Sequence, residues 1–318
     1  MHPSKNIALA LLLLLAASSA TTLGATLSIS NGVLEVRGTI DPGDASRIEL
    51  ALDGGAKIVR IHSPGGQLAE ALRIGQAIRA RGIELRVAGL CSSACAQLVL
   101  PGAKTLHIED GSVIAMHAAA EGAFLSAERE GRFERVPDAV AEAALAPIRK
   151  HRNDIADFFE MTNVNAEAMN FMYQLTSTTD VDVSYVVASS GKVDLTLVGR
   201  KDPVCRAWLL NADTLRSLGI QASGWRAAGR LKAAFILGEP YDLIYDGPVT
   251  SKQELAASIG CAALRESVQS RQPAVKPNHS VKLSANGMSR WPPSAGPSAH
   301  FALAVQRVTP SSPAYLKR

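Results

Sequence analysis

The fold of this chain is decided by residues 89–102, which read Gly-Leu-Cys-Ser-Ser-Ala-Cys-Ala-Gln-Leu-Val-Leu-Pro-Gly. The pattern predicts the end of a β-strand, a tight turn, and a short helix that begins near Ser93 and stops at Pro101-Gly102. Such a turn lifts one hydroxyl out of the sheet and points a helix N-terminus at the group that the hydroxyl attacks. Residues 89–102 therefore carry a candidate site as well as a fold signature.

Strands and helices alternate on both sides of this turn. The apolar patterns predict strands over residues 26–40, 57–62, 84–88, 105–108 and 112–117, and helices over residues 44–52, 67–81 and 93–100. This alternation is typical of an α/β fold with a parallel sheet, in which ligands bind at the carboxyl ends of the strands. The Ser63–Gly66 turn, the Ser93 turn and His117 all follow predicted strands, so we expect them to lie at one edge of the sheet.

Composition divides the chain into four parts. We expect a signal peptide at residues 1–25, the main domain at 26–199, a small α/β appendage at 200–266, and a disordered basic tail at 267–318, which is rich in Pro, Ser and Ala. Within the main domain, residues 118–137 are polar and predict an insertion or lid. Helices are predicted over residues 138–159 and 165–175, a polar turn over 176–182, and strands over 184–188 and 193–198.

The first 25 residues have the pattern of a secretory signal peptide. Lys5 precedes an unbroken apolar run from Ile7 to Ala17, and small residues that suit a signal peptidase follow it. The run is shorter than the roughly 20 apolar residues of a membrane span. We therefore expect export to a bacterial periplasm, with an uncleaved membrane anchor as the alternative.

The net charge of +4 has its origin in the tail. Residues 267–318 contain no Asp or Glu, and their basic residues are Arg271, Lys276, Lys282, Arg290, Arg307, Lys317 and Arg318. The rest of the chain is therefore net negative, and the positive charge does not indicate a nucleic-acid-binding domain. We expect no specific nucleic-acid partner.

The four cysteines suggest two pairs, Cys91 with Cys95 and Cys205 with Cys261. An exported protein permits disulfides. A spacing of four residues around a helix start allows a disulfide that would strap the Ser93 turn, and two buried thiols are the alternative. No His cluster accompanies the cysteines, so we expect no metal and no cofactor.

Ser93 is the candidate nucleophile and His117 the candidate general base, provided that the two lie close together. A Ser before a helix is most often an N-cap, and Ser92 is an alternative functional hydroxyl. His62 and His107 compete as bases. By strand alternation His62 points away from the following turn, and His107 lies in the middle of a strand.

The Gly65-Gly66 pair follows a predicted strand. Its backbone N–H groups can point at a ligand oxyanion because no side chain blocks the approach. Pro-Gly-Gly is also a common turn, so the pair alone is a weak signal.

Taken together, these residues resemble the Clp-type serine protease family of the crotonase-like superfamily, over roughly residues 33–198. In that family a Pro-Gly-Gly turn supplies oxyanion N–H groups, and the nucleophile follows one Gly by four residues and precedes another by nine. Gly89, Ser93 and Gly102 keep this spacing. The resemblance implies a fold of repeated ββα units around a parallel sheet.

The resemblance also implies the roles of the site residues. Ser93 is the expected nucleophile and His117 the general base, and the N–H groups of Gly66 and Ala94 form the expected oxyanion hole. A carboxylate should orient the base, and Asp182 is preferred to Asp180 for this role.

The expected activity is that of an exported serine peptidase, with a peptide or protein as substrate and a homo-oligomer as the expected assembly. Cys95 departs from the pattern, because the Clp protease has Gly two residues after its Ser. An ATP-driven partner is not expected outside the cytoplasm. The alternatives are a non-catalytic binding module of the cell envelope with the same fold and a crotonase-like enzyme that acts on acyl-CoA, although export argues against the second.

Overall fold

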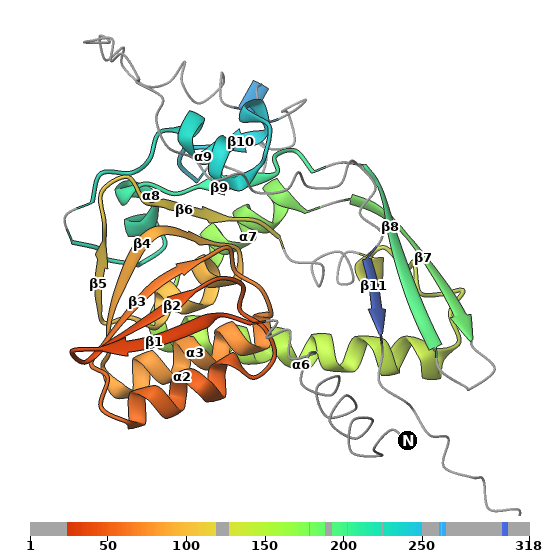
Figure 1. Cartoon of the computed structure of the whole chain (residues 1–318). Helices are drawn as coiled ribbons and strands as arrows, with labels where there is room; N and C mark the ends of the chain where they lie inside the picture. The colour runs from red at the N-terminus through yellow and green to blue at the C-terminus, as the bar shows by residue number, and fades with distance from the viewer. Residues whose placement is uncertain are drawn as a thin grey trace, which may run out of the picture.

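The computed structural model describes residues 24–118, 127–177, 179–187, 193–201, 203–223, 225–249, 261, 263–264 and 301–304. In these residues the protein has a mixed α/β fold with a mostly parallel sheet (Figure 1). The expected signal peptide lies outside the described residues except for its last two positions. No helix in the described part of the chain is long and apolar enough to cross a membrane.

The main sheet has eight strands in the order β1-β2-β3-β4-β6-β9-β10, with β5 also paired to β4. The strands are β1 (Thr26–Ser30), β2 (Val33–Arg37), β3 (Ile58–Ser63), β4 (Glu84–Ser92), β5 (Thr105–Ile108), β6 (Val113–Met116), β9 (Ala207–Leu209) and β10 (Ile244–Tyr245). Strands β2, β3, β4 and β6 run parallel, whereas β1 and β9 are antiparallel to β2 and β6.

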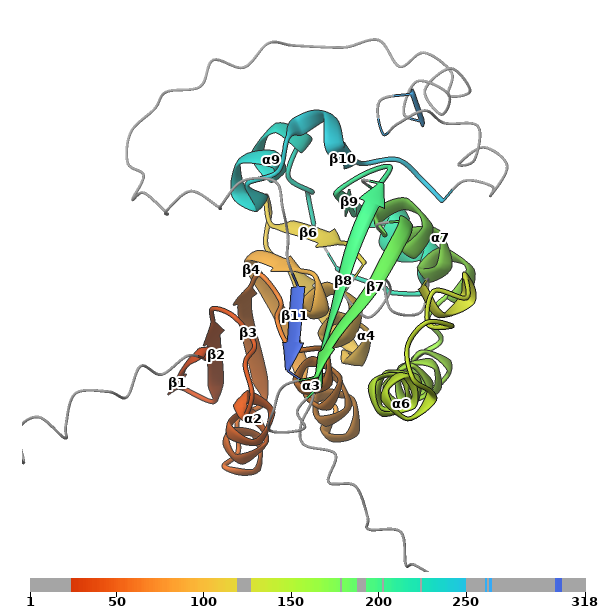
Figure 2. The same ribbon diagram turned by 90° about the vertical axis from the view of Figure 1, so that its right-hand side faces the viewer.

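Helices cover one face of strands β2 to β4. The helices in the described part of the chain are α2 (Asp44–Asp53), α3 (Leu68–Arg81), the π-helix η1 (Cys95–Val99), α4 (Leu100–Gly102), α6 (Asp138–Thr162), α7 (Ala166–Thr176), α8 (Ala212–Ser217), α9 (Arg230–Leu237) and the short η2 (Tyr241–Leu243). Both views show α2 and α3 on the same side of these strands (Figures 1 and 2). Alternate strand residues face them and are fully buried, namely Leu34, Val36, Val59, Ile61, Leu85 and Val87.

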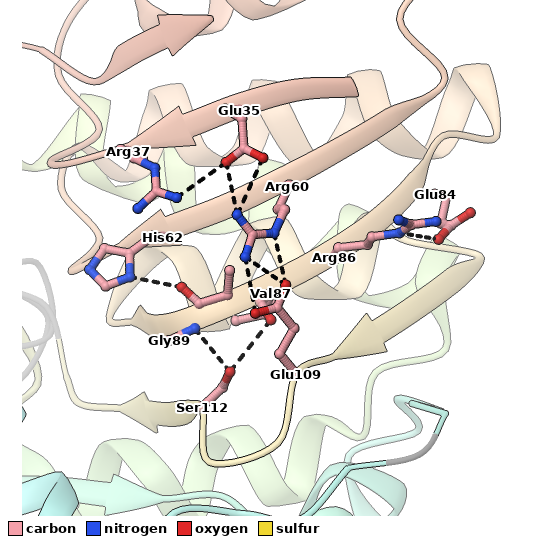
Figure 3. A network of polar contacts seen from close by, with 11 residues as sticks. Glu35, Arg37, Arg60, His62, Glu84, Arg86, Val87, Gly89, Glu109 and Ser112 are labelled. Carbon is pink, nitrogen blue, oxygen red and sulfur yellow. Dashed lines mark hydrogen bonds and ion pairs between the residues drawn. The ribbon is translucent and has the colours of Figure 1, made fainter. Parts of the chain in front are cut away.

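The other face of the same strands carries charged side chains (Figure 3). The Arg60 guanidinium on β3 donates to both carboxylate oxygens of Glu109 at 2.8 and 3.0 Å and to Glu35 on β2 at 3.2 Å. The hydrogen bonds from Arg60 hold the pKa of Glu109 below its usual value. The sheet therefore has one apolar face and one polar face, which is why its strands alternate in sequence.

Residues 26–40 form a hairpin rather than the single predicted strand. Strands β1 and β2 pair with Ser30 opposite Val33, and the connecting residues Asn31 and Gly32 have φ angles of 51° and 74°. A two-residue turn of this kind needs positive φ at both positions, which Asn-Gly accepts readily. The Asn31-Gly32 dipeptide was therefore the sequence signal for this hairpin.

Strand β4 extends beyond its predicted end at residue 88 as far as Ser92. Its first half, Glu84–Val87, pairs with β5, and its second half, Leu90–Ser92, pairs with β6. Gly89 lies between the two halves with a φ of 91°. This fork brings the carboxyl end of β6 beside the end of β4.

A second, three-stranded sheet consists of β7 (Thr179–Val187), β8 (Val193–Lys201) and β11 (Phe301–Ala304). Strand β7 begins inside the predicted polar turn at 176–182, because Val181 is buried against Phe133, Val136 and Leu145. Helix α6 runs from this sheet towards α3 (Figure 1). Residues 119–126 of the predicted insertion lie outside the described residues.

Residues 200–266, which the sequence predicts as an appendage, contribute strands β9 and β10 to the main sheet. Trp208 and Tyr245 on these strands are fully buried, and both make edge contacts with the Phe171 ring of α7. This aromatic contact ties the segment to the main core. In the predicted disordered tail, residues 301–304 instead form β11 against β8, and the rest lies outside the described residues.

Candidate functional site

The Ser93 turn has the geometry of a strained strand-to-helix elbow. Ser93 follows the last residue of β4 and has a φ of 54°, which is uncommon for a residue with a side chain. Its N–H donates to Ala115 O of β6 at 2.9 Å, and its carbonyl accepts from Gln97 N at 2.9 Å. The strained residue is thus held from the neighbouring strand and from the helix that follows. A sharp turn of this kind exposes the nucleophilic hydroxyl of α/β-hydrolases.

The two neighbouring serines of the turn have different roles. The Ser92 hydroxyl is 5% exposed and donates to Pro64 O at 2.9 Å. Ser93 is partly exposed, and no described hydrogen bond involves its hydroxyl. The hydroxyl of Ser92 is therefore used to hold the Pro-Gly-Gly turn, whereas the described contacts do not use the Ser93 hydroxyl to cap the helix.

The Pro-Gly-Gly turn lies directly against the Ser93 turn. A Cβ atom added to Gly65 would lie 2.7 Å from Ser93 Cβ and 2.9 Å from Ala94 N, closer than real side chains approach. Gly65 also has a φ of 97°. Glycine is therefore required at this position both by its backbone conformation and by the contact with Ser93.

The N–H of Gly66 points away from Ile40. Ile40 bridges to the turn on its other side, donating to Gly65 O and accepting from Gln67 N, both at 2.8 Å. In a parallel pairing of this kind the intervening residue, Gly66, points its own N–H the opposite way. That side is occupied by the end of β4, since β3 lies between β2 and β4.

Ala94 supplies a second backbone donor beside the same turn. It is the first residue of the helical stretch that follows Ser93, where N–H groups lack an intrahelical acceptor. A Cβ atom added to Gly65 would lie 2.9 Å from Ala94 N, so Ala94 and Gly66 lie on either side of the contact between the two turns. An oxyanion is the group that such a pair of donors binds best.

A disulfide straps the Ser93 turn. Cys91 and Cys95 are joined, with Cα atoms 5.3 Å apart, so the bond spans the strand end, the strained residue and the first turn of the helix. Cys205 and Cys261 form a second disulfide. The alternative of buried thiols does not occur, since no cysteine is free.

His117 lies just beyond β6, the strand that receives the N–H of Ser93. Its ring is exposed, and its Nδ1 lies 2.9 Å from Ala118 O. A carbonyl oxygen can only accept, so Nδ1 carries the proton of the neutral ring and Nε2 is free to accept one. Among the described contacts no hydrogen bond joins the ring to the Ser93 hydroxyl, so this structure has the two side chains unpaired with each other.

The predicted carboxylate partner of His117 lies in the second sheet, whereas His117 follows a strand of the main sheet. Strand β9 is the neighbour of β6, with Met116 opposite Trp208. Asp182 is half-buried on β7 of the second sheet, opposite Val198, and the side chain of Asp180 lies outside the described residues. The backbone oxygen of Ala118 is the group that contacts His117 Nδ1.

The two alternative bases have other positions. His62 Nδ1 lies 2.8 Å from Ala88 O on the polar face of the sheet (Figure 3). His107 is on β5, opposite Arg86 in the first half of β4, whereas Ser93 follows the second half. His107 therefore lies away from the Ser93 turn, whereas His62 lies near the carboxyl end of β3 with its Nδ1 in contact with Ala88 O.

The site does not coincide with the cavity between α3 and α6. Within the described residues there is no group of three or more His, Cys, Asp or Glu side chains that could hold a metal. A cavity of about 440 Å³ lies between α3 and α6, and its lining includes Arg73, His151 and Asp157. Neither Ser93 nor His117 lines this cavity.

Comparison of the chain with models of known protein families gives no match, and comparison with curated proteins gives no significant relative. The function must therefore be argued from the geometry of the site.

Proposed function

We propose that this protein is an exported serine hydrolase of the Clp/crotonase fold type that cleaves peptide bonds. The observation that carries the proposal is the close contact between the Pro-Gly-Gly turn and the strained Ser93. A Cβ atom added to Gly65 would lie only 2.7 Å from Ser93 Cβ. A strained turn is costly, by about 1–3 kcal/mol, and such turns cluster at functional sites.

In the proposed reaction the Ser93 hydroxyl attacks a peptide carbonyl carbon, and its proton passes to His117 Nε2. The carbonyl oxygen becomes an oxyanion that accepts hydrogen bonds from the N–H groups of Gly66 and Ala94. When the C–N bond breaks, the departing amine takes the proton from His117 and an acyl ester remains on Ser93. Water then attacks the ester with His117 again as base, which releases the acid and restores the hydroxyl.

The base is proposed to be oriented mainly by a backbone oxygen. The hydrogen bond of His117 Nδ1 with Ala118 O sets the tautomer that the reaction needs. The family resemblance predicts that the Asp182 carboxylate orients His117. Asp182 lies on β7, so a mutation there tests the carboxylate without changing the Ala118 carbonyl oxygen.

A non-catalytic binding module is the second candidate. The observation that favours it is the described contact of the His117 ring, which is with the Ala118 carbonyl oxygen and not with the Ser93 hydroxyl. Such a module would keep the two N–H groups for a carboxylate or peptide carbonyl without turning it over.

A fluorophosphonate probe, which reacts with activated serines, separates the two candidates. The peptidase predicts covalent labelling of the full chain that is lost in Ser93→Ala and is reduced in His117→Ala. The matched control is Ser46→Ala, because the Ser46 hydroxyl contacts Arg73 and plays no part in the site. The absence of labelling in the folded wild-type protein would overturn the peptidase and favour the module.

A further inference from the structure

The peptide bond between His117 and Ala118 is held at both of its polar atoms. The Gln97 side-chain amide donates through Nε2 to the carbonyl oxygen of His117. The N–H of Ala118 donates to Thr176 Oγ1 at 2.6 Å. Gln97 and Thr176 are 1% and 6% exposed, so both hydrogen bonds are formed by buried side chains.

This peptide bond follows the last residue of β6, Met116, and is no longer part of the strand. A buried or half-buried peptide group without partners costs free energy, so the fold must supply them from elsewhere. Two side chains distant in sequence do so, one from the π-helix η1 and one from the end of α7.

Gln97 links the nucleophile to the base through a single residue. Its backbone N–H donates to the carbonyl of Ser93 at 2.9 Å, and its side chain donates to the carbonyl of His117. Gln97 also lies two residues after Cys95, the end of the disulfide strap. Gln97 therefore ties the backbone of His117 to that of Ser93, in addition to the hydrogen bond from Ser93 N to Ala115 O of β6.

Thr176 completes the arrangement from the opposite side. Its hydroxyl donates to Met172 O in the preceding turn of α7 at 2.8 Å and accepts from Ala118 N, so the one oxygen is used both ways. With its donor already committed, the oxygen presents a lone pair in a fixed direction to Ala118.

We propose that Gln97 and Thr176 are positioning residues that fix the His117–Ala118 peptide and thereby aim His117 Nε2 at Ser93. This inference rests on the proposed function. Holding the carbonyl of His117 restricts the backbone from which its ring extends, and holding the N–H of Ala118 restricts the residue whose carbonyl oxygen contacts His117 Nδ1. The tautomer with Nε2 unprotonated then follows from two buried side chains rather than from a carboxylate.

The test uses the full-length protein with ¹⁵N in its alanine amides and histidine rings. Thr176→Val keeps the shape of the side chain and removes its oxygen, whereas Thr176→Ser keeps the oxygen. We expect hydrogen exchange of the Ala118 amide to rise about tenfold in Thr176→Val, in line with the loss of one hydrogen bond, and to change less than about twofold in Thr176→Ser. The signal is assigned by its absence in Ala118→Gly.

Ring ¹⁵N shifts of His117 give a readout that a merely structural role would not move. We expect the Nδ1–H tautomer to predominate in the wild type and in Thr176→Ser, and to give way to a mixture in Thr176→Val and in Gln97→Met. The matched control is Thr162→Val, because the Thr162 hydroxyl makes the same bond to a preceding turn, with Phe158 O at 2.7 Å, but lies on α6. Thr162→Val should leave both the Ala118 exchange rate and the His117 tautomer unchanged.

An unchanged Ala118 exchange rate and unchanged tautomer in both Thr176→Val and Gln97→Met would overturn the proposal. Because neither readout needs activity, failure of the proposed function is seen separately, as a wild-type protein that fluorophosphonate does not label. If Thr176→Val does not fold, Gln97→Met, which preserves the length of the side chain, decides the question by the same ring shifts.

Discussion

Gly65 and Ser93 are in contact at a distance that admits no side chain on Gly65, since a Cβ atom there would lie 2.7 Å from Ser93 Cβ. The two residues are 28 positions apart in sequence and lie just beyond the carboxyl ends of neighbouring parallel strands, β3 and β4. The contact joins the proposed oxyanion turn to the proposed nucleophile, so each holds the other in place.

Gly65→Ala should therefore disrupt the site as well as the fold. The new Cβ meets Ser92 O at 2.6 Å in addition to Ser93, and the φ of 97° is unfavourable for alanine. We expect a loss of about 2–4 kcal/mol in the free energy of unfolding, from backbone strain and overpacking together. The control is Gly82→Ala, which has a φ of 62° but nothing within 4 Å of the added atom.

Urea unfolding measures both variants, and fluorophosphonate labelling reports the site. Gly82→Ala should lose only about 1–2 kcal/mol, the cost of a left-handed conformation, and should label as the wild type does. Equal losses in the two variants, with labelling kept in Gly65→Ala, would contradict the close contact.

The disulfide that spans Ser93 should matter more for reactivity than for stability. Cys91 and Cys95 are four residues apart, whereas Cys205 and Cys261 are 56 apart. From the entropy of loop closure, removal should cost about 2 kcal/mol for the short loop and about 4 kcal/mol for the long one. The double variant Cys91→Ser/Cys95→Ser should nevertheless be the one that loses fluorophosphonate labelling, because it frees the strained turn.

Melting temperatures and labelling rates of this variant and of Cys205→Ser/Cys261→Ser provide the measurement. If the folded Cys91→Ser/Cys95→Ser protein is labelled at the wild-type rate, the proposed role of this disulfide in holding Ser93 is wrong.

Asp182→Asn distinguishes a carboxylate partner of His117 from the Ala118 carbonyl. A catalytic carboxylate replaced by its amide typically costs a serine protease about 10⁴-fold in rate. With the Ala118 carbonyl in that role, we expect the labelling rate to fall by less than about tenfold, a small effect for a residue outside the catalytic machinery. A loss of several thousand-fold with an unchanged melting temperature would establish Asp182 as the acid.

The polar face of the sheet predicts a loss of stability in acid. Hydrogen bonds from Arg60 lower the pKa of Glu109 in the folded protein, so Glu109 binds a proton more readily when the chain is unfolded. Its contribution is present above the unfolded value of about 4.3 and is lost as the pH falls through the folded value. Glu109→Gln should therefore be destabilised most at pH 7 and least at pH 3.

Urea unfolding over that pH range checks this expectation, with Asp213→Asn as a control because the Asp213 side chain is 85% exposed. A difference between wild type and Glu109→Gln that does not vary with pH would show that the ion pair is not the cause.

The sequence predicts local elements well where one signal suffices. The helix ending at Gly82 and the strand at 105–108 match α3 and β5, because apolar periodicity and a left-handed cap act within a few residues. The meeting of the Pro-Gly-Gly turn with Ser93 could also be expected, since ends of parallel strands share an edge.

Long-range pairing was beyond sequence reasoning. The place of β9 beside β6 depends on Trp208 packing with Phe171, and nothing in residues 200–266 indicates which strand they join. For the same reason Gln97 and Thr176 could not be singled out, because their hydrogen bonds depend on where the chain turns after β6. Asp182 was preferred from the family resemblance, and it stays a prediction, because sequence order does not reveal which strands lie next to His117.

The most direct test of the central claim is to map the fluorophosphonate adduct on the full-length protein by mass spectrometry of its peptides. The account predicts one adduct per chain, on Ser93, with Ser92 unmodified. An adduct on another serine, or a folded protein that carries none, would contradict it.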